Sequence, residues 1–474
     1  MKNSIFTKKA YIRWFVFLIW MVIWYLAAHL VGNDLILPGP HRVLVALVGL
    51  MGTGHFWLDV LWTLLRTVIG IVISFGFGVL FGALASRNNI VKEFLRLPVS
   101  FFKSIPVMAV IIYVILVVKS DWVAVVVCFL MCFPIAYTNI LNGLEALDNS
   151  LLELGNTLGL RRGQMIKFII RPSIDTQIRT ALSLIAAMSW KVVVASEVLA
   201  IPRFSIGYQM LNSKYYLETA DLFAYMIVLI VMSLLMEKLV GKIVKLSAEG
   251  SGKAVSGDAE RASAIAVPSE PCTIRFQNVS KVFTNEDGTE SPALKDFSGI
   301  FSPGITALLG PSGEGKTTVA RITSGLEEAD SGEVSISAKA RVAYLFQEDR
   351  LLPWLSVKGN MMLAFAAGNP SGKDPETAVK EMANKLEISE ALGMMPHELS
   401  GGMAHRAALG RTLLYSGNVL ILDEPFRGLD EDLKDRIIEV LKEDLKPARS
   451  SRTVILITHD EELADSMADC KIRI

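Results

Sequence analysis

The feature that most constrains this chain is a series of six long apolar runs in its first half. They cover about residues 14–31, 60–85, 98–118, 122–143, 180–200 and 222–243. Each is close to the roughly 20 residues that a helix needs to cross the hydrocarbon core of a bilayer. The first run lacks a convincing small-residue cleavage site, so we expect it to be a retained helix. The sequence therefore predicts an all-α polytopic membrane domain over residues 1–246.

The loops between these runs indicate an orientation. With a cytoplasmic N-terminus, the inside segments hold fifteen Lys and Arg residues, and the outside segments hold four: Arg42, Lys119, Arg203 and Lys214. Cytoplasmic loops carry the excess of positive charge in multi-pass proteins. Six crossings also return the chain to the cytoplasm, so we expect the second half of the chain to lie there.

The second half has a different character. Residues 247–271 are rich in Ala, Ser, Gly and charge, and predict a flexible linker. Residues 272–474 resemble an ordinary soluble α/β domain. Lys plus Arg and Asp plus Glu balance at 47 each, so the net charge indicates no partner, and we expect no nucleic acid.

A phosphate-binding motif opens the soluble half. Gly310-Pro-Ser-Gly-Glu-Gly-Lys-Thr317 fits GxxxxGK[ST], after an apolar strand-like run and before a helix-like stretch. Its backbone N–H groups would hold phosphate oxygens, Lys316 would reach the β- and γ-phosphates, and Thr317 would hold Mg²⁺. The expected ATP-binding residues here are Gly310, Pro311, Ser312, Gly313, Gly315, Lys316, Thr317 and Thr318.

Two acidic residues end a second apolar strand. In Val419-Leu-Ile-Leu-Asp423-Glu424, Asp423 suits the coordination sphere of Mg²⁺ and Glu424 suits polarising an attacking water.

Further motifs resemble the ABC ATPase family and agree with it in order and spacing over about residues 272–474. Leu399-Ser-Gly-Gly-Met403 is similar to the LSGGQ signature, and Gly428-Leu-Asp430 to the D-loop. The resemblance implies a P-loop NTPase fold with a helical subdomain. It also implies roles for further residues, as follows: Gln347 (Q-loop, also near Mg²⁺) and His459 (switch histidine) with Glu424 in catalysis, and Phe283, Ser400, Gly401, Gly402 and Asp430 in ATP binding.

The family mechanism implied is a head-to-tail dimer in which each ATP lies between one phosphate loop and the other chain's signature. Since this chain carries one of each, the resemblance implies a homodimer. Met403 replaces the glutamine usual in the signature, His405 stands where a polar amide is common, and Glu314 places a carboxylate in the phosphate loop. The serine and glycines that contact phosphate are retained, so we expect catalysis to be retained.

The basic loop between the fourth and fifth runs carries another resemblance. Glu153-Leu-Gly155-Asn-Thr-Leu-Gly159, continuing to Ile169-Ile-Arg-Pro172, resembles the cytoplasmic EAA loop of bacterial importer permeases. Leu154, Gly155 and Arg171 depart from that pattern. The resemblance implies a short coupling helix over Glu153–Gly159, docked on the ATPase near Gln347 and residues 352–354.

Shorter stretches are similar to the nitrate, sulfonate and taurine transporters, including Leu37-Pro-Gly-Pro40, Lys103-Ser-Ile-Pro106, Ser196-Glu197 and Arg350-Leu-Leu-Pro-Trp354. Fusion of the two halves is unusual for that group. Lys191 and Glu197 lie in the fifth run, where ionisable residues are costly, and they are candidates for the translocation path. Six residues apart, they do not share one helix face, so a direct pair is not expected.

Together these resemblances imply a type I ABC importer subunit in the cytoplasmic membrane. It would hydrolyse ATP with Mg²⁺ to import a small, anionic solute that a separate extracytoplasmic binding protein delivers. Two other readings stay open. One is an ABC exporter half-transporter, which also joins membrane and ATPase domains in this order. The other is a membrane-bound ATP-dependent sensor that transports nothing.

Overall fold

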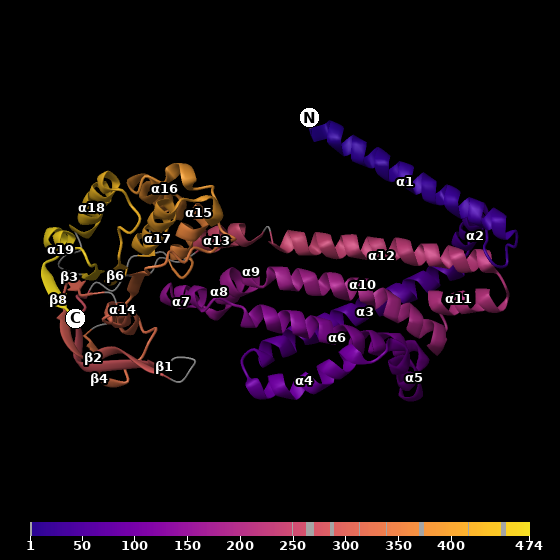
Figure 1. Cartoon of the computed structure of the whole chain (residues 1–474), viewed down its shortest axis with the longest axis horizontal. Coiled ribbons are helices and arrows are strands. Elements are labelled where there is room, and N and C mark those ends of the chain that lie inside the picture. Colours follow the sequence, from indigo (N-terminus) through magenta and orange to yellow (C-terminus); the bar gives the residue numbers. More distant parts are fainter. Residues whose placement is uncertain are drawn as a thin grey trace. The chain divides into compact units, whose positions relative to one another are not determined.

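The computed structural model describes residues 2–248, 250–261, 270–284, 289–311, 313–337, 339–368, 374–415, 417–446 and 452–474. The chain forms two compact units. The first comprises Met1–Leu147 and Ile174–Leu246, and the second comprises Asp148–Ser173 and Ser247–Ile474. Each unit is considered by itself, and Figure 1 gives the labels of their elements.

The first unit is entirely helical. Its helices are α1 (Lys2–Val31), α2 (Pro40–Met51), α3 (Gly54–Ala85), α4 (Asn89–Ser104), α5 (Val107–Val117), α6 (Ser120–Glu145), α10 (Asp175–Ala200), α11 (Ile206–Tyr215) and α12 (Thr219–Ala248). Among the described residues, five helices are long and apolar enough to cross a membrane, or six if the bent pair α4–α5 counts as one span. This agrees with the polytopic all-α domain expected from the sequence.

The third expected span, 98–118, is not one continuous helix. α4 ends at Ser104, α5 begins at Val107, and the chain bends by 109° between them. Ile105 is extended, with ψ of 137°, because the ring of Pro106 disfavours a helical conformation in the residue before it. The third expected span is therefore broken at Ile105 and Pro106, and the expected number of six spans holds if the bent pair is one span.

α6 packs against both α3 and α10, at the centre of the unit (Figure 1). α3 approaches it closely through small residues on one face. A Cβ added to Gly70 would lie 2.6 Å from Cys128 Sγ, and one added to Gly78 would lie 2.2 Å from the Cβ of Ala136. Small residues permit such backbone approach in membrane helices. The two cysteines Cys128 and Cys132 are buried packing residues at this contact.

The second unit contains two sheets. An antiparallel sheet has the order β2-β1-β4, from β1 (Ile274–Thr284), β2 (Glu290–Phe301) and β4 (Ser331–Ile336). A parallel sheet has the order β5-β6-β7-β3-β8, from β3 (Gly304–Leu309), β5 (Val342–Leu345), β6 (Val419–Asp423), β7 (Thr453–Ile457) and β8 (Cys470–Arg473). Strands β3, β6 and β7 are buried along their whole length, which explains their unbroken apolar sequences.

The second unit also contains helices. They are α14 (Lys316–Thr323), α15 (Val357–Met362), α16 (Pro375–Lys385), α17 (Gly401–Tyr415), α18 (Glu431–Leu445) and α19 (Glu461–Met467), with short turns η2 (Leu363–Phe365), η3 (Ser389–Ala391) and η4 (Pro396–Glu398). Helices α15, α16 and α17 pack on one another as a helical subdomain. The α/β nucleotide-binding fold with a helical subdomain is thus present.

The segment 148–173 lies in the second unit although it interrupts the helices of the first. It contains α7 (Asn149–Thr157), α8 (Arg162–Met165), the wide turn η1 (Ile166–Ile170) and α9 (Arg171–Ser173). Residues 247–271 were expected to be a flexible linker, but Gly250–Glu260 form helix α13. Val255 and Ala259 of α13 are buried in the core of the second unit, which accounts for its order. Residues 262–269 lie outside the described residues.

Candidate functional site

The candidate nucleotide site lies where four parallel strands end. β5, β6, β7 and β3 are consecutive neighbours in the sheet, so their carboxyl ends meet at one edge. Gln347 follows β5, the pair Asp423 and Glu424 ends β6, His459 follows β7, and the phosphate loop follows β3. Motifs that are up to about 150 residues apart in the sequence therefore converge by topology alone.

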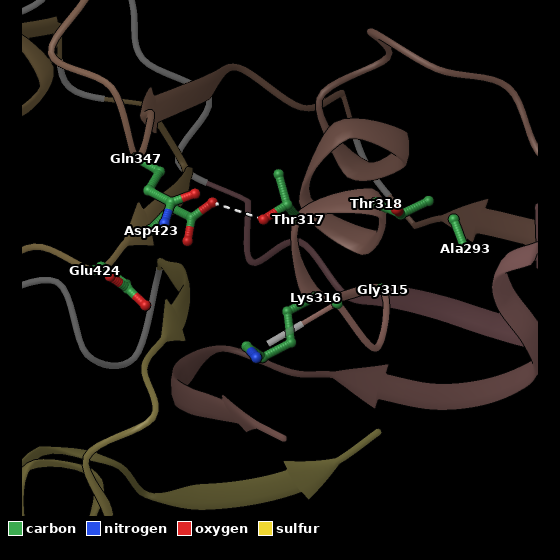
Figure 2. Close-up of a pocket in the computed structure, with 9 residues that line it drawn as sticks. Ala293, Gly315, Lys316, Thr317, Thr318, Gln347, Asp423 and Glu424 are labelled. Carbon is green, nitrogen blue, oxygen red and sulfur yellow. Dashed lines mark hydrogen bonds between the residues drawn. The ribbon is translucent and has the colours of Figure 1, made fainter. Parts of the chain in front are cut away.

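A pocket of about 200 Å³ occupies this edge (Figure 2). It brings together eight of the expected residues and one that sequence reasoning missed: Gly313, Gly315, Lys316, Thr317, Thr318, Gln347, Asp423, Glu424 and, unexpected, Ala293. Ala293 comes from β2. A Cβ on Gly315 would lie 2.3 Å from the carbonyl oxygen of Ala293, so a glycine with φ of 97° is required there. The sequence around Ala293 gave no signal that this residue would line the pocket.

The phosphate loop is folded around its own lysine. Lys316 Nζ donates hydrogen bonds to the carbonyl oxygens of Gly310 at 2.6 Å and Pro311 at 2.7 Å. Lys316 begins α14, and Gly310, Gly313 and Gly315 all have positive φ. The ammonium group is therefore held at the mouth of the loop, next to the N-terminus of a helix that favours anions. Ser312, expected in this loop, lies outside the described residues.

Thr317 and Asp423 form the polar floor of the pocket. Thr317 Oγ1 donates to Asp423 Oδ2 at 3.2 Å, as the dashed line in Figure 2 shows. Burial raises the pKa of Asp423 to about 6; the hydrogen bond from Thr317 opposes this, while the charge of Glu424 adds to it. Two oxygens that share an octahedral Mg²⁺ at about 2.1 Å lie about 3 Å apart. The hydroxyl and carboxylate are therefore spaced to hold that ion together, with the Gln347 side chain facing the same space.

Glu424 directly follows Asp423 and has φ of 49°, uncommon for a residue other than glycine. His459 Nδ1 lies 3.2 Å from Glu424 Oε1, and the histidine side chain is 74% exposed. Backbone strain of this kind persists only where the surroundings impose it. Here the Glu424 N–H is fixed by the carbonyl oxygen of Ile457, at the end of the neighbouring strand.

The signature residues lie elsewhere. Ser400 and Gly401 are exposed at the start of α17, outside the lining of the pocket. Ser400 Oγ accepts a hydrogen bond from Met403 N at 3.3 Å, so the serine caps the helix, and Gly402 packs against the backbone of Gly428. Asp430 is exposed just before α18.

Phe283 is also absent from the pocket lining. Its half-exposed ring is covered by Lys281, whose Nζ is 5.6 Å from the ring centroid. His405, which departs from the family signature, contacts a residue near the Q-loop. Its Nδ1 lies 2.8 Å from Oδ1 of Asp349, two residues after Gln347.

The segment 148–173, which was expected to contain a coupling helix and is called the coupling segment below, contacts the α/β fold within the second unit. Glu153 accepts two hydrogen bonds from Arg321, at 2.7 and 3.0 Å, and one from Arg350 at 2.8 Å. Burial alone would raise the pKa of Glu153, but the hydrogen bonds and charges of both arginines hold it below its usual value. The carboxylate is therefore ionised at neutral pH. Sequence reasoning missed Arg321, although its place on the helix that follows the phosphate loop was available as a signal.

Apolar packing and two further hydrogen bonds complete this contact. Leu154 and Phe168 are buried in the same core as the ATPase strands. Trp354 Nε1 donates to the carbonyl oxygen of Phe168 at 2.9 Å, and Gln164 Nε2 donates to that of Ala366. The tryptophan lies in the stretch that was expected to contact this loop.

The two expected glycines have different positions. The helix observed is Asn149–Thr157, so it begins before Glu153 and ends before Gly159, which has φ of 63°. A Cβ on Gly155 would lie 2.6 Å from the side chain of Met165 in α8 and 2.7 Å from that of Ile169 in η1, so a glycine at this position lets both elements pack closely.

The two ionisable residues of α10 differ in environment. Lys191 is exposed on the first unit. Glu197 is fully buried, and Arg66 Nη1 donates to its Oε1 at 2.9 Å. Glu197 thus has a partner that sequence reasoning did not identify, and no direct contact with Lys191 is recorded between these described residues.

Comparisons with known proteins match both halves. Residues 294–427 match the family described as "ABC transporter", and residues 74–247 match "Binding-protein-dependent transport system inner membrane component". An aliphatic sulfonates import ATP-binding protein of Paracoccus denitrificans is 38% identical over 38% of this chain and 72% of its own length. A maltose/maltodextrin import ATP-binding protein of Photorhabdus laumondii is 34% identical over 42% of this chain, and the match spans about half, 54%, of that relative.

Among solved structures, a dimeric bacterial ABC transporter cassette is 24% identical over 42% of this chain and 94% of its own, with a TM-score of 0.38. The permease match lies in the helical first half, and the ATPase match covers the phosphate loop and the acid pair. The chain belongs to the ABC transporter family and joins, in one polypeptide, a permease domain of the binding-protein-dependent type to the family's ATPase domain.

Proposed function

We propose that this chain is one half of an ATP-driven importer for a small anionic solute, of the sulfonate, nitrate or taurine kind. The observation that carries the proposal is the docking of Glu153 on Arg321 and Arg350. Arg321 lies on α14, the helix that begins at Lys316, and Arg350 follows Gln347 by three residues. A rearrangement of either nucleotide-contacting element would therefore pull on the loop that connects α6 to α10.

The chemistry assigned to the ATPase domain is hydrolysis of the γ-phosphate. Lys316 and the phosphate-loop N–H groups would bind the phosphate oxygens. Thr317, Asp423 and Gln347 would hold Mg²⁺, which neutralises charge that develops on the phosphate. Glu424 would orient the attacking water and accept its proton.

His459 would hold the Glu424 carboxylate from the outer side, across the 3.2 Å contact. Ser400, Gly401 and Gly402 would supply N–H and hydroxyl groups to a second chain's nucleotide, with Asp430 beside them. Their exposure at a helix N-terminus supports this role, because such N–H groups suit an anion. The functional unit would then be a homodimer with two composite sites, and Phe283 would stack on adenine.

The proposed location is the cytoplasmic membrane, with the ATPase domain in the cytoplasm. Delivery of solute is assigned to a separate extracytoplasmic binding protein, which the matched permease family carries in its description. The solute class is assigned from resemblance to sulfonate import proteins and from the short motifs shared with that group.

Proteoliposomes that contain the full chain test the proposal. The binding protein encoded nearest to this chain's gene is added outside, ATP is enclosed, and uptake of radiolabelled ethanesulfonate, taurine and nitrate is followed. Uptake that requires both ATP and the binding protein, and that Lys316→Ala abolishes, is the expected result. Outward movement would instead identify an exporter, and hydrolysis with no movement of any solute in either direction would identify a sensor.

A further inference from the structure

The first unit contains a cavity of about 380 Å³ that the transport cycle proposed above does not use. It lies between residues 62–69 of α3, the start of α6 and the segment that connects α10 to α11. Its lining combines aromatic and aliphatic side chains with two arginines and one aspartate: Trp62, Leu65, Arg66, Ile69, Asp121, Trp122, Val125, Arg203 and Phe204. Such a mixture suits a ligand that has both an apolar and a charged part.

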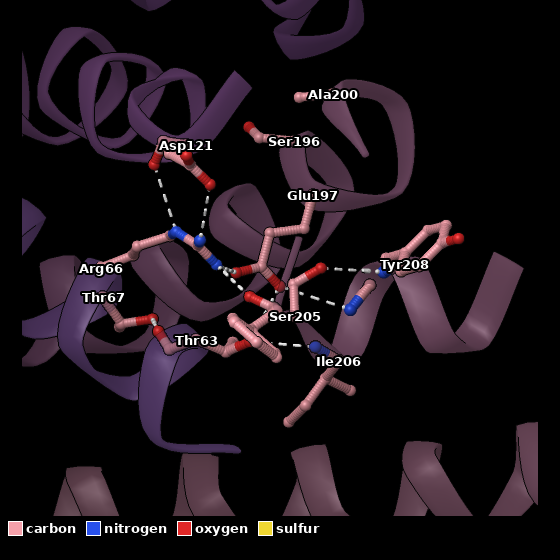
Figure 3. Close-up of polar contacts among 12 residues, drawn as sticks. Thr63, Arg66, Thr67, Asp121, Ser196, Glu197, Ala200, Ser205, Ile206 and Tyr208 are labelled. Atoms are coloured by element: carbon pink, nitrogen blue, oxygen red, sulfur yellow. Dashed lines mark hydrogen bonds and ion pairs between the residues drawn. The ribbon is translucent and has the colours of Figure 1, made fainter. Parts of the chain in front are cut away.

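Arg66, which lines the cavity, belongs to a polar cluster that extends behind it (Figure 3). Arg66 Nη1 donates to Glu197 Oε1 at 2.9 Å and to the carbonyl oxygen of Phe204 at 2.7 Å, while Nε donates to the carbonyl oxygen of Asp121 at 3.2 Å. Thr63 Oγ1 donates to the other carboxylate oxygen of Glu197 at 2.9 Å. Burial and hydrogen bonding thus hold the guanidinium plane in one orientation.

Two groups of this lining retain unused capacity. Arg66 Nη2 makes one long contact, 3.4 Å to Asp121 Oδ1, and the Asp121 side chain is 66% exposed. Arg203 lies over the ring of Phe204, with its guanidinium carbon 5.2 Å from the centroid. Within the described residues, no carboxylate is recorded as a partner of Arg203. The cavity therefore offers a free cation at one side and an exposed carboxylate at another.

The surroundings indicate the medium from which a ligand would come. The charge distribution of the loops places the start of α3, the start of α6 and the end of α10 on the outer side. Trp62, Leu65 and Trp122 stay 40–55% exposed on this unit, on helices that are apolar enough to span a membrane. Tryptophans at such a level are typical of the boundary between acyl chains and head groups.

We propose that this cavity binds the head group of a zwitterionic phospholipid of the outer leaflet. Its phosphate would accept hydrogen bonds from Arg203 and from Arg66 Nη2, since a guanidinium group matches phosphate geometry. Its ammonium group would lie at Asp121, and the first carbons of its chains would lie against Leu65, Trp62 and Trp122. A purely anionic ligand is disfavoured, because its charge would face the exposed Asp121 carboxylate, whose contact with Arg66 Nη2 is long, at 3.4 Å.

Native mass spectrometry of the purified full chain in neutral detergent tests this assignment. The probes are phosphatidylethanolamine, phosphatidylglycerol and octanesulfonate, each titrated separately. The variants are Arg203→Gln, Arg203→Lys and Asp121→Asn, and the matched control is Lys214→Gln, which removes an exposed outer cation that does not line the cavity. Arg203 is on an exposed connection, so its replacement should leave folding unaffected.

We expect Arg203→Gln to weaken phosphatidylethanolamine binding about tenfold, the effect of one charge-assisted hydrogen bond, with Arg203→Lys in between and Lys214→Gln unchanged. Asp121→Asn should remove the preference for phosphatidylethanolamine over phosphatidylglycerol. Equal effects of Arg203→Gln and Lys214→Gln would overturn the proposal, as would displacement of the phospholipid by octanesulfonate. Neither ATP nor transport enters the measurement, so its outcome is independent of the proposed import activity.

Discussion

Replacing Glu153 by glutamine tests the link between the ATPase and the permease most directly. The substitution keeps the shape of the side chain and removes its charge. Of the three hydrogen bonds from Arg321 and Arg350, the amide oxygen can keep one or two, while the new NH₂ group faces guanidinium donors. We therefore expect the coupling segment to dock less firmly while the nucleotide pocket stays intact.

The size of the effect follows from the burial of the contact. Hydrogen bonds to charged groups contribute about 1.5–3 kcal/mol each. The three side chains are only 11–23% exposed, so screening by solvent is modest. Losing one such bond and the charge that offsets two cations costs about 2–3 kcal/mol, which is about a 30- to 150-fold change in the docking equilibrium.

The assay is a comparison of solute uptake with basal ATP hydrolysis in the same proteoliposomes. Uptake should fall at least about tenfold, whereas hydrolysis should stay within about twofold of the parental rate. Glu145→Gln is the matched control, because Glu145 is in the same helix–loop region but forms an exposed pair with Lys92, and solvent screens such a pair strongly. Full uptake by Glu153→Gln, or an equal loss in both variants, would refute the reasoning.

Three further predictions concern the nucleotide site. Glu424→Gln should keep ATP binding and trap a dimer, seen by size-exclusion chromatography with ATP; hydrolysis at the parental rate would reject the assignment. Below pH 6, Mg²⁺·ATP binding should weaken about tenfold per pH unit, because the raised pKa of Asp423 means that its carboxyl must release a proton to bind the ion. Calorimetry should show that Asp423→Asn binds Mg²⁺·ATP weakly and that its affinity no longer depends on pH in this range. The same pH dependence in the variant and the parental protein would refute the assignment. Mixed Lys316→Ala and Ser400→Arg chains should recover about a quarter of the parental composite sites, whereas each variant alone should be inactive; hydrolysis by a monomer would contradict the model.

Most residues that line the candidate nucleotide pocket could be predicted from the sequence, because they are concentrated in short motifs. Lys316 and Thr317 share a loop, and Asp423 and Glu424 end one strand, so their relative positions depend on local geometry and on a parallel sheet. Ala293 was not accessible, because it contributes only a backbone oxygen against which Gly315 packs. Such a contact leaves no mark on the side chain.

The membrane unit was less predictable. The lengths and hydropathy of its spans indicated helices, but pairing of Arg66 with Glu197 joins residues 131 positions apart and depends on how α3 packs beside α10. The break at Pro106 carried a local signal, yet hydropathy alone merges α4 and α5 into one span. Helix α13 was not predicted, because its glycines and serines have low helix propensity. Burial of Val255 and Ala259, which depends on the tertiary structure, outweighs that propensity.

The presence of both partners of the docking contact on one polypeptide has a consequence for how the complex responds to damage. Helix α13 contributes to the same core as the coupling segment, and Lys167 Nζ lies 2.8 Å from Asp258 Oδ1 between them. Because both partners belong to one polypeptide, each experiences the other at an effective concentration on the order of millimolar. In a complex built from separate chains, a weakened contact ends in dissociation and loss of stoichiometry. In this chain the partners stay together in a fixed one-to-one ratio. A weakened contact is therefore expected to leave ATP hydrolysis uncoupled from solute transport.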